Sequence, residues 1–220
     1  MTRQVVSKKR IADHGEVYTR EREVNAMLDL VQQETLRIES RFLEPACGTG
    51  NFLIEILARK LKVVEQRYKR NQRDFERYAF LAVSSLYGID ILQDNIETCR
   101  NRLFYQLDER YSSLYQKKTQ QAFREVIRFV LGKNIILGDA LSLQTVAKKP
   151  DPIVFSEWSF VRGNQVKRRD FAFHELIPEE GDMPLFSSSI PKSDQGKPVF
   201  IPEPVADFPL CHFMRIADAD

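Results

Sequence analysis

The chain has 220 residues, which is enough for one domain with a sizeable hydrophobic core and few for two. Its 33 Lys and Arg against 31 Asp and Glu give a net charge of +2, which neither requires nor excludes a nucleic-acid partner. The three cysteines lack metal-type or redox-type spacing, and their odd number argues against a disulfide framework, so we expect a protein of the reducing cytoplasm. No stretch approaches the roughly 20 apolar residues of a membrane span, and the three histidines are scattered. We therefore expect a soluble protein with neither a membrane partner nor a metal.

Helices and strands are predicted to alternate along the first 160 residues, because the hydrophobic period switches repeatedly between 3.6 and short continuous apolar runs. Predicted helices cover residues 22–36, 53–61, about 70–84, 93–107 and 119–131. Predicted strands cover residues 41–47, 86–92, 134–141 and 151–160. Such alternation implies βαβ crossovers. The expected fold is α/β, with a Rossmann-like, doubly wound, mainly parallel sheet and helices on both faces.

The pattern ends near residue 178. Seven of the ten prolines lie at or after Pro178, which prevents a long helix and disfavours central strands. We expect residues 1–177 to form one domain that begins with a helical segment. Residues 178–220 are expected to form a proline-rich C-terminal tail, or an extended arm that lies on another surface.

A glycine turn interrupts the segment RFLEPACGTGNFLIEIL, residues 41–57. An apolar strand that breaks at Gly48 and Gly50 and continues as a helix leaves backbone N–H groups free at the turn, where a polar ligand can bind. The spacing is G-x-G, with Leu53 where a third glycine would be, so a dinucleotide site is weakly supported. Glu44 ends the strand and could accept hydrogen bonds from an amino-bearing ligand.

Four segments resemble, in the same order, the motifs of class I S-adenosylmethionine-dependent methyltransferases, and specifically of the DNA adenine amino-methyltransferases (N-6 DNA methylases) of restriction-modification systems. These segments are HGEVYTREREV (14–24), LEPACGTGNFL (43–53), LYGIDIL (86–92) and NIILGDAL (134–141). The first departs from the family's G-x-[FY]-[FY]-T-P motif because Arg20 replaces the proline. The resemblance covers roughly residues 14–160.

The resemblance implies S-adenosylmethionine as the cofactor. It implies that the methionine part lies on the glycines and that Tyr18 and Thr19 close this end. Asp90 is expected to accept both ribose hydroxyls, Ile91 to pack on the adenine face, and Asp139 to accept a hydrogen bond from the adenine amine. The implied cofactor-binding residues are Tyr18, Thr19, Glu44, Pro45, Ala46, Cys47, Gly48, Gly50, Asn51, Phe52, Asp90, Ile91, Asp139 and Ala140. Each role has an alternative. The glycines could form a plain structural turn, and Ile91 could be an ordinary core residue. Asp139 could be a solvent-facing residue at a strand end, and Tyr18 and Thr19 could form a simple helix cap.

The family methylates the exocyclic amine of adenine with a [DNS]-P-P-[YFW] tetrad, whose polar residue accepts an amine proton and whose aromatic residue stacks on a flipped base. Here the fourth apolar run reads DPIVFSEWSF, so Ser156 takes the polar position while Glu157 and Trp158 replace the prolines. One hypothesis is a variant catalytic loop of these three residues. The others are a cofactor-binding but catalytically silent subunit or fragment that acts through partners, and a methyltransferase for RNA, protein or a small molecule. Trp158 could also be an ordinary core residue.

Basic residues follow this run and alternate with aromatics. Arg162, Lys167, Arg168 and Arg169 are candidates for contact with a nucleic-acid backbone, and a solvated strand edge is the alternative.

In full-length family members a separate later region reads the DNA sequence, and only about 60 residues follow the fourth run. The resemblance therefore implies DNA as a partner, in a restriction-modification or phage-defence system. Either a specificity or restriction subunit supplies recognition, or the chain is a fragment.

Overall fold

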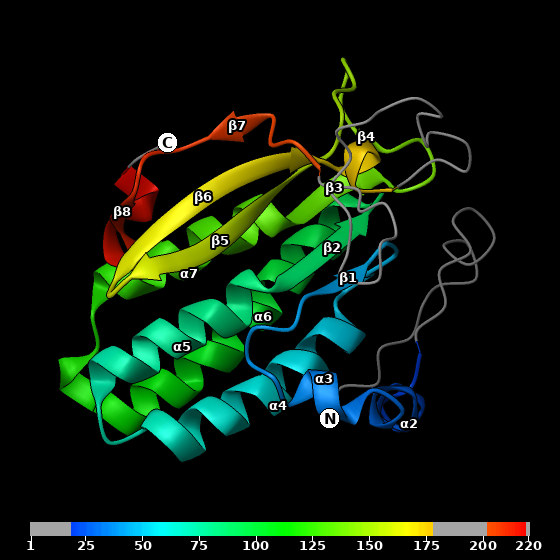
Figure 1. The fold of residues 1–220 in the computed structure, drawn as a ribbon. Coiled ribbons are helices and arrows are strands. Elements are labelled where there is room, and N and C mark those ends of the chain that lie inside the picture. Colours follow the sequence, from blue (N-terminus) through cyan, green and yellow to red (C-terminus); the bar gives the residue numbers. More distant parts are fainter. Residues whose placement is uncertain (1–18, 178–201, 219–220) are drawn as a thin grey trace, which may run out of the picture.

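The fold is α/β and Rossmann-like (Figure 1) in the computed structural model, which describes residues 19–177 and 202–218. Strands β1 (Phe42–Glu44), β2 (Leu86–Asp90) and β3 (Ile135–Asp139) are parallel and neighbours in that order. The short strand β4 (Gln144–Thr145) pairs antiparallel with β3. The predicted α/β, Rossmann-like class with a mainly parallel sheet and the first three predicted strands are confirmed.

Helices connect the strands as predicted. They are α2 (Glu21–Asp29), α3 (Gln32–Thr35), α4 (Asn51–Tyr68), α5 (Gln72–Ser84), α6 (Gln93–Tyr115) and α7 (Gln121–Asn134), with the 3-10 helix η1 (Gln116–Lys118) before α7. The side chain of Asn71 caps α5 by accepting hydrogen bonds from two N–H groups of its first turn. Helix α6 runs beyond the predicted end at residue 107 because its buried stripe continues to Tyr111, whose hydroxyl bonds Glu76.

The two faces of β2 contact different layers. Leu86 belongs to the main core, and a Cβ atom added at Gly88 would meet Leu53 of α4 at 3.0 Å, so helices cover this face closely. Tyr87 and Ile89 alternate with them and pack on a second cluster that contains Phe155. In the described residues, an extended segment therefore covers the face where a second layer of helices was expected.

A hairpin of β5 (Val154–Arg162) and β6 (Gln165–Ala172) provides this segment and extends over α5 and α7 (Figure 1). Its strands are antiparallel and belong to a sheet separate from β1–β4. Residues 154–162 thus form a strand, as predicted for 151–160, but the expectation that this strand belongs to the mainly parallel sheet is wrong. Trp158 and the helix residues Phe80 and Phe129 make edge-to-face contacts, with ring centroids 6.1 and 6.0 Å apart, so apolar contact with the helices holds β5 outside the main sheet.

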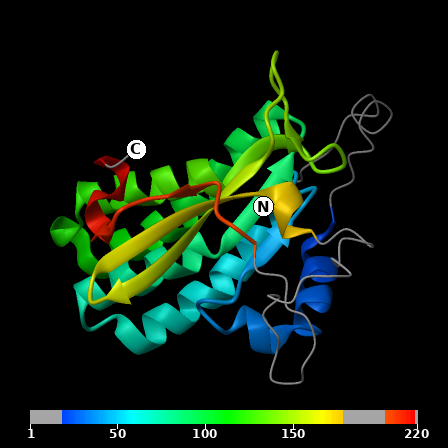
Figure 2. The ribbon, with the colours of Figure 1, turned by 45° about the horizontal axis from the view of Figure 1, so that its top comes forward.

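Residues near the C-terminus return to this hairpin. Strands β7 (Ala206–Asp207) and β8 (Cys211–His212) pair with β6. The 3-10 helix η3 (Phe213–Asp218) follows them and packs on α7. Another 3-10 helix, η2 (Phe173–Leu176), comes directly after β6. Figure 2 shows this arm running along the hairpin. An arm on another surface was one of the two expectations for residues 178–220, of which 178–201 and 219–220 lie outside the described part. The domain boundary at residue 178 stays a prediction. No helix in the described ranges is both long and apolar enough to cross a membrane.

Candidate functional site

The glycine turn joins the carboxyl end of β1 to the start of α4. The N–H of Cys47 donates to the carbonyl of Ile89 at 2.8 Å, and the N–H of Gly50 donates to the carbonyl of Cys47 at 2.8 Å. Gly48 and Gly50 have φ of 51° and 88°, a left-handed conformation that disfavours other residues. A Cβ atom at Gly48 would have no neighbour within 4 Å, so the turn is open at this point.

Asp90 ends β2 beside the turn, and its carboxylate ties the two strand ends together. Oδ2 accepts a hydrogen bond from the N–H of Gly48 at 2.9 Å. Oδ1 accepts from the N–H of Leu92 at 2.9 Å and from the side chain of Asn95 at 3.1 Å. A carboxylate has about four lone-pair sites, and the described residues occupy three of them, which leaves one on Oδ2.

Helix α6 contacts the glycine turn through the side chain of Arg102. Its Nη1 donates to the carbonyl of Thr49 at 2.6 Å, to the Thr49 hydroxyl at 3.2 Å and to Oδ1 of Asn51 at 2.9 Å. The Asn51 amide in turn donates to the carbonyl of Thr19 at 3.2 Å. The segment before α2, the turn and α6 are thereby connected; Tyr18, the other expected residue of this segment, lies outside the described part.

Glu44 is half-buried at the end of β1. Burial raises the pKa of its carboxyl, and a hydrogen bond from the N–H of Ala46, at 3.4 Å, partly offsets this rise. Pro45 and Ala46 are exposed, so the surface between Glu44 and the glycines is accessible. A partly desolvated carboxylate at an open turn is suited to bind a cationic group.

The expected adenine end of the site lies at the next two strand ends. Ile91, directly after Asp90, is 44% exposed although it is a large apolar residue. Asp139 ends β3 and accepts a hydrogen bond from the N–H of Leu141 at 2.9 Å, which with the Ser142 hydroxyl lowers the pKa of the Asp139 carboxyl. Ala140 is half-buried against the second cluster, and Phe52 packs on the main core from the first turn of α4.

The predicted catalytic residues contact other parts of the molecule. Glu157 forms an ion pair with Arg41, which precedes β1, whereas the glycine turn follows β1. The Ser156 hydroxyl is buried and donates to Asp170 at 2.7 Å. Trp158 is 5% exposed and packs on α5 and α7. The structure therefore does not bring these three residues to the glycine turn, and their catalytic role stays a prediction.

Three of the four predicted nucleic-acid contacts have partners within the chain. Arg168 is buried and forms two hydrogen bonds with the Asp170 carboxylate, at 2.8 and 2.7 Å. Lys167 pairs with Asp207 of the arm, and Arg169 pairs with Glu157 at 3.2 Å. Arg162 is exposed beside the hairpin turn.

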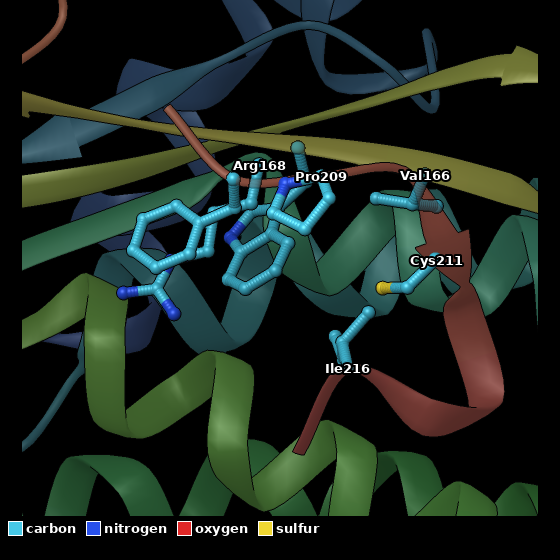
Figure 3. A pocket seen from close by; sticks show the side chains of 7 residues that line it. Val166, Arg168, Pro209, Cys211 and Ile216 are labelled. Carbon is cyan, nitrogen blue, oxygen red and sulfur yellow. The ribbon is translucent and has the colours of Figure 1, made fainter. Parts of the chain in front are cut away.

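A small cavity lies between the hairpin and the arm, where Val166 and Arg168 of β6 face Pro209, Cys211 and Ile216 (Figure 3). Its volume of about 10 Å³ is that of roughly one water molecule. This cavity cannot hold a nucleoside and belongs to the packing of the arm. Among the residues the structure describes, no group of three His, Cys, Asp or Glu side chains could hold a metal ion.

Sequence reasoning missed three residues that support the site from one face of α6. The side-chain amide of Asn95 donates to Asp90, and Arg102 donates to Thr49 and Asn51. The Sγ of Cys99 would be only 2.6 Å from a Cβ atom added at Gly50. Their spacing of four and three residues places them on the same helical face. A polar, a small and a basic residue in succession along that face of the predicted helix were the available signal.

The fold and the turn together define an α/β domain whose ligand crevice lies at the carboxyl ends of its parallel strands. Comparison with protein families places residues 18–165 in the MmeI DNA-methyltransferase domain, so the chain belongs to this family. The resemblance to methyltransferases of restriction-modification systems is confirmed. Neither the curated proteins nor the solved structures gave a match.

Proposed function

We propose that this chain binds S-adenosylmethionine for the methylation of the exocyclic amine of adenine in DNA, within a restriction-modification or phage-defence system. The family match supports DNA methylation. The observation that carries the cofactor proposal is the hydrogen bond between the Gly48 N–H and Asp90, which joins a glycine turn and an acidic strand end at one crevice. Adenine as the target base is supported by the motif order described above.

The residues of the crevice fit the cofactor. Glu44 suits the ammonium of the methionine part, and the open side of Gly48 leaves space for that part against the backbone. Asp90 suits the ribose hydroxyls, and the described residues leave an acceptor site open on its Oδ2. The exposed side chain of Ile91 suits one face of the adenine ring. When bound, the cofactor supplies an electrophilic methyl group on a sulfonium.

The remaining site residues are proposed to complete this environment. Asp139, whose pKa is lowered by its hydrogen bonds with Leu141 and Ser142, and Ala140 would meet the adenine amine, and Thr19 and Asn51 would border the methionine end. Pro45, Ala46, Cys47 and Phe52 shape the turn around it. These residues bind and orient the cofactor; the acceptor for the amine protons of the target base is a separate requirement.

A second candidate is favoured by the position of the hairpin. Ser156, Glu157 and Trp158 are held by Asp170, Arg41 and the helices, and in the described part of the chain β1 pairs with β2 alone. The catalytic residues would then come from elsewhere. In this version the chain is a cofactor-binding unit that acts with a partner, such as a specificity or restriction subunit.

Calorimetry with S-adenosylmethionine and its demethylated product tests cofactor binding. We expect wild-type protein to bind both, and Asp90→Ala to weaken binding at least about tenfold through the lost hydrogen bonds. Asp207→Ala, which removes an aspartate of the arm, is the matched control and should bind normally. Absence of heat from folded wild-type protein would refute the cofactor proposal.

Transfer of a tritiated methyl group to unmethylated DNA tests the reaction. Label recovered as N6-methyladenine supports the proposed activity, and label on cytosine contradicts it. Cofactor binding without transfer supports the second candidate.

A further inference from the structure

We propose that Arg102 is a positioning residue that holds the glycine turn and the segment before α2 in the geometry that binds the cofactor. This inference rests on the proposed function. It concerns a residue outside all four segments of the resemblance, and it follows from where the Arg102 guanidinium makes its hydrogen bonds.

Arg102 acts on the one residue between the two glycines. Both glycines have left-handed φ, a conformation that glycine also leaves readily, so the turn needs support from outside its own backbone. Arg102 supplies this support at the carbonyl of Thr49, 2.6 Å from Nη1, and at the Thr49 hydroxyl. A guanidinium donates from a rigid planar group, so these contacts define the direction of the carbonyl as well as its distance.

The same nitrogen orients Asn51. Oδ1 of Asn51 accepts from Arg102 at 2.9 Å, so its Nδ2 must point the other way, where it donates to the Thr19 carbonyl at 3.2 Å. An inverted amide would place its N–H groups against the donors of the guanidinium. Arg102 thereby determines, through Asn51, how the segment before α2 is attached beside the turn.

A general stabilising role explains these contacts less well. The core of α6 is formed by large buried side chains such as Leu103 and Leu107, each at most 1% exposed, whereas Arg102 is half-buried at the edge of the helix. The three hydrogen bonds of Arg102 converge on two adjacent parts of the expected cofactor site. Loss of Arg102 should therefore change ligand affinity more than global stability.

Binding of the demethylated cofactor, S-adenosylhomocysteine, by calorimetry is the first test. We expect Arg102→Met to weaken binding about tenfold or more, with a melting temperature within about 2 °C of wild type. Arg110→Met is the matched control, because Arg110 lies on the same helix, two turns away, and its partner Glu65 is 3.7 Å distant. Arg102→Lys keeps the charge on a shorter, non-planar group and should recover only part of the affinity.

Hydrogen exchange of the free protein is the second test and needs no ligand. Arg102→Met should accelerate exchange of the backbone amides in residues 47–54 and 19–24, and Arg110→Met should not. If wild-type protein binds no cofactor, the proposed function fails while exchange still tests the positioning role. Unchanged exchange, unchanged affinity in Arg102→Met, or full recovery by Arg102→Lys would each overturn the inference. If Arg102→Met does not fold, Arg102→Lys is compared with wild type. The inference is then overturned if Arg102→Lys shows the same exchange and the same affinity as wild type.

Discussion

The two glycines of the turn are required for different physical reasons. Gly48 has a left-handed φ, but a side chain there would enter open space. Gly50 has a left-handed φ and also lies against Cys99, whose Sγ would be 2.6 Å from an added Cβ. Real Cβ atoms do not approach a sulfur so closely, so backbone conformation and packing both demand glycine at residue 50.

Alanine substitutions should separate these effects in urea unfolding. Gly48→Ala should lower the free energy of unfolding by about 1 kcal/mol through its φ alone, and Gly50→Ala by about 2–4 kcal/mol through φ and the clash with Cys99. Gly132→Ala is the control, because Gly132 lies on an open face of α7, where alanine should stabilise by about 0.5–1 kcal/mol. Equal losses at Gly48 and Gly50 would show that Cys99 moves aside at little cost.

Lys60 is a fully buried cation on α4. Its ammonium donates to the carbonyl of Ser40 and to the hydroxyl of Ser85, close to the start of β1. Burial lowers the pKa of Lys60 from 10.5 to about 7, although Glu39 and Glu34 act in the opposite direction. Above about pH 7 the folded state therefore favours the neutral amine, whereas the unfolded state keeps the proton.

This pKa predicts stability that rises with pH. Between about pH 7 and 10.5 the unfolded chain binds a proton at Lys60 that the folded chain largely lacks, so the free energy of unfolding should increase by up to about 1.4 kcal/mol per pH unit. Below about pH 7 both states are protonated and this contribution stays constant. Urea unfolding at about pH 7 and about pH 9.5 should show this increase in the free energy of unfolding for wild type, and Lys60→Met should lack it. Parallel pH profiles of the two proteins would contradict the assignment.

Among the elements, the β5–β6 hairpin departs most from expectation. Gly163 and Asn164 lie between the paired residues Arg162 and Gln165, and Gly163 has a φ of 55°. A Gly-Asn pair between two extended runs is a hairpin signal that was present in the sequence. The apolar run at residues 151–160 alone does not distinguish a strand of the main sheet from the first strand of a hairpin.

The hairpin contains a buried ion pair that should be structural. Removing the carboxylate in Asp170→Ala should lower the free energy of unfolding by about 3–5 kcal/mol, because Arg168 then keeps its buried charge without this partner. The double variant Arg168→Met with Asp170→Leu should recover most of the loss. Asp207→Ala, which breaks the more exposed pair with Lys167, should change stability by at most about 1 kcal/mol. Similar effects of Asp170→Ala and Asp207→Ala would contradict the structural role.

At the scale of the whole molecule, the C-terminal arm belongs to the main core. Phe213 is 2% exposed and lies 5.7 Å from Phe80 of α5, measured between ring centroids. Ile216 is equally buried, so η3 joins the hairpin and the helices into one packed unit. The arm therefore should unfold together with the rest of the described structure.

Truncation of Phe213 tests this packing. Phe213→Ala should lower the free energy of unfolding by about 3–5 kcal/mol while fluorescence and circular dichroism still report one transition. Leu210→Ala changes a side chain of the same arm that is 50% exposed and should have an effect below about 0.5 kcal/mol. A negligible effect of Phe213→Ala would show that the arm is not part of the core.

The sequence by itself determined the order of elements as far as β3 and placed the glycine turn and Asp90 at strand ends. These features are local, because the hydrophobic period and the conformational freedom of glycine depend only on residues that are close in the sequence. Only the tertiary structure decided the partner of residues 154–162 and the support that α6 gives to the turn. An extended run looks the same whether its neighbour is parallel or antiparallel, and Arg102 meets Thr49 across 53 residues of chain. Such pairings depend on which surfaces the packed helices leave available, which no local pattern records.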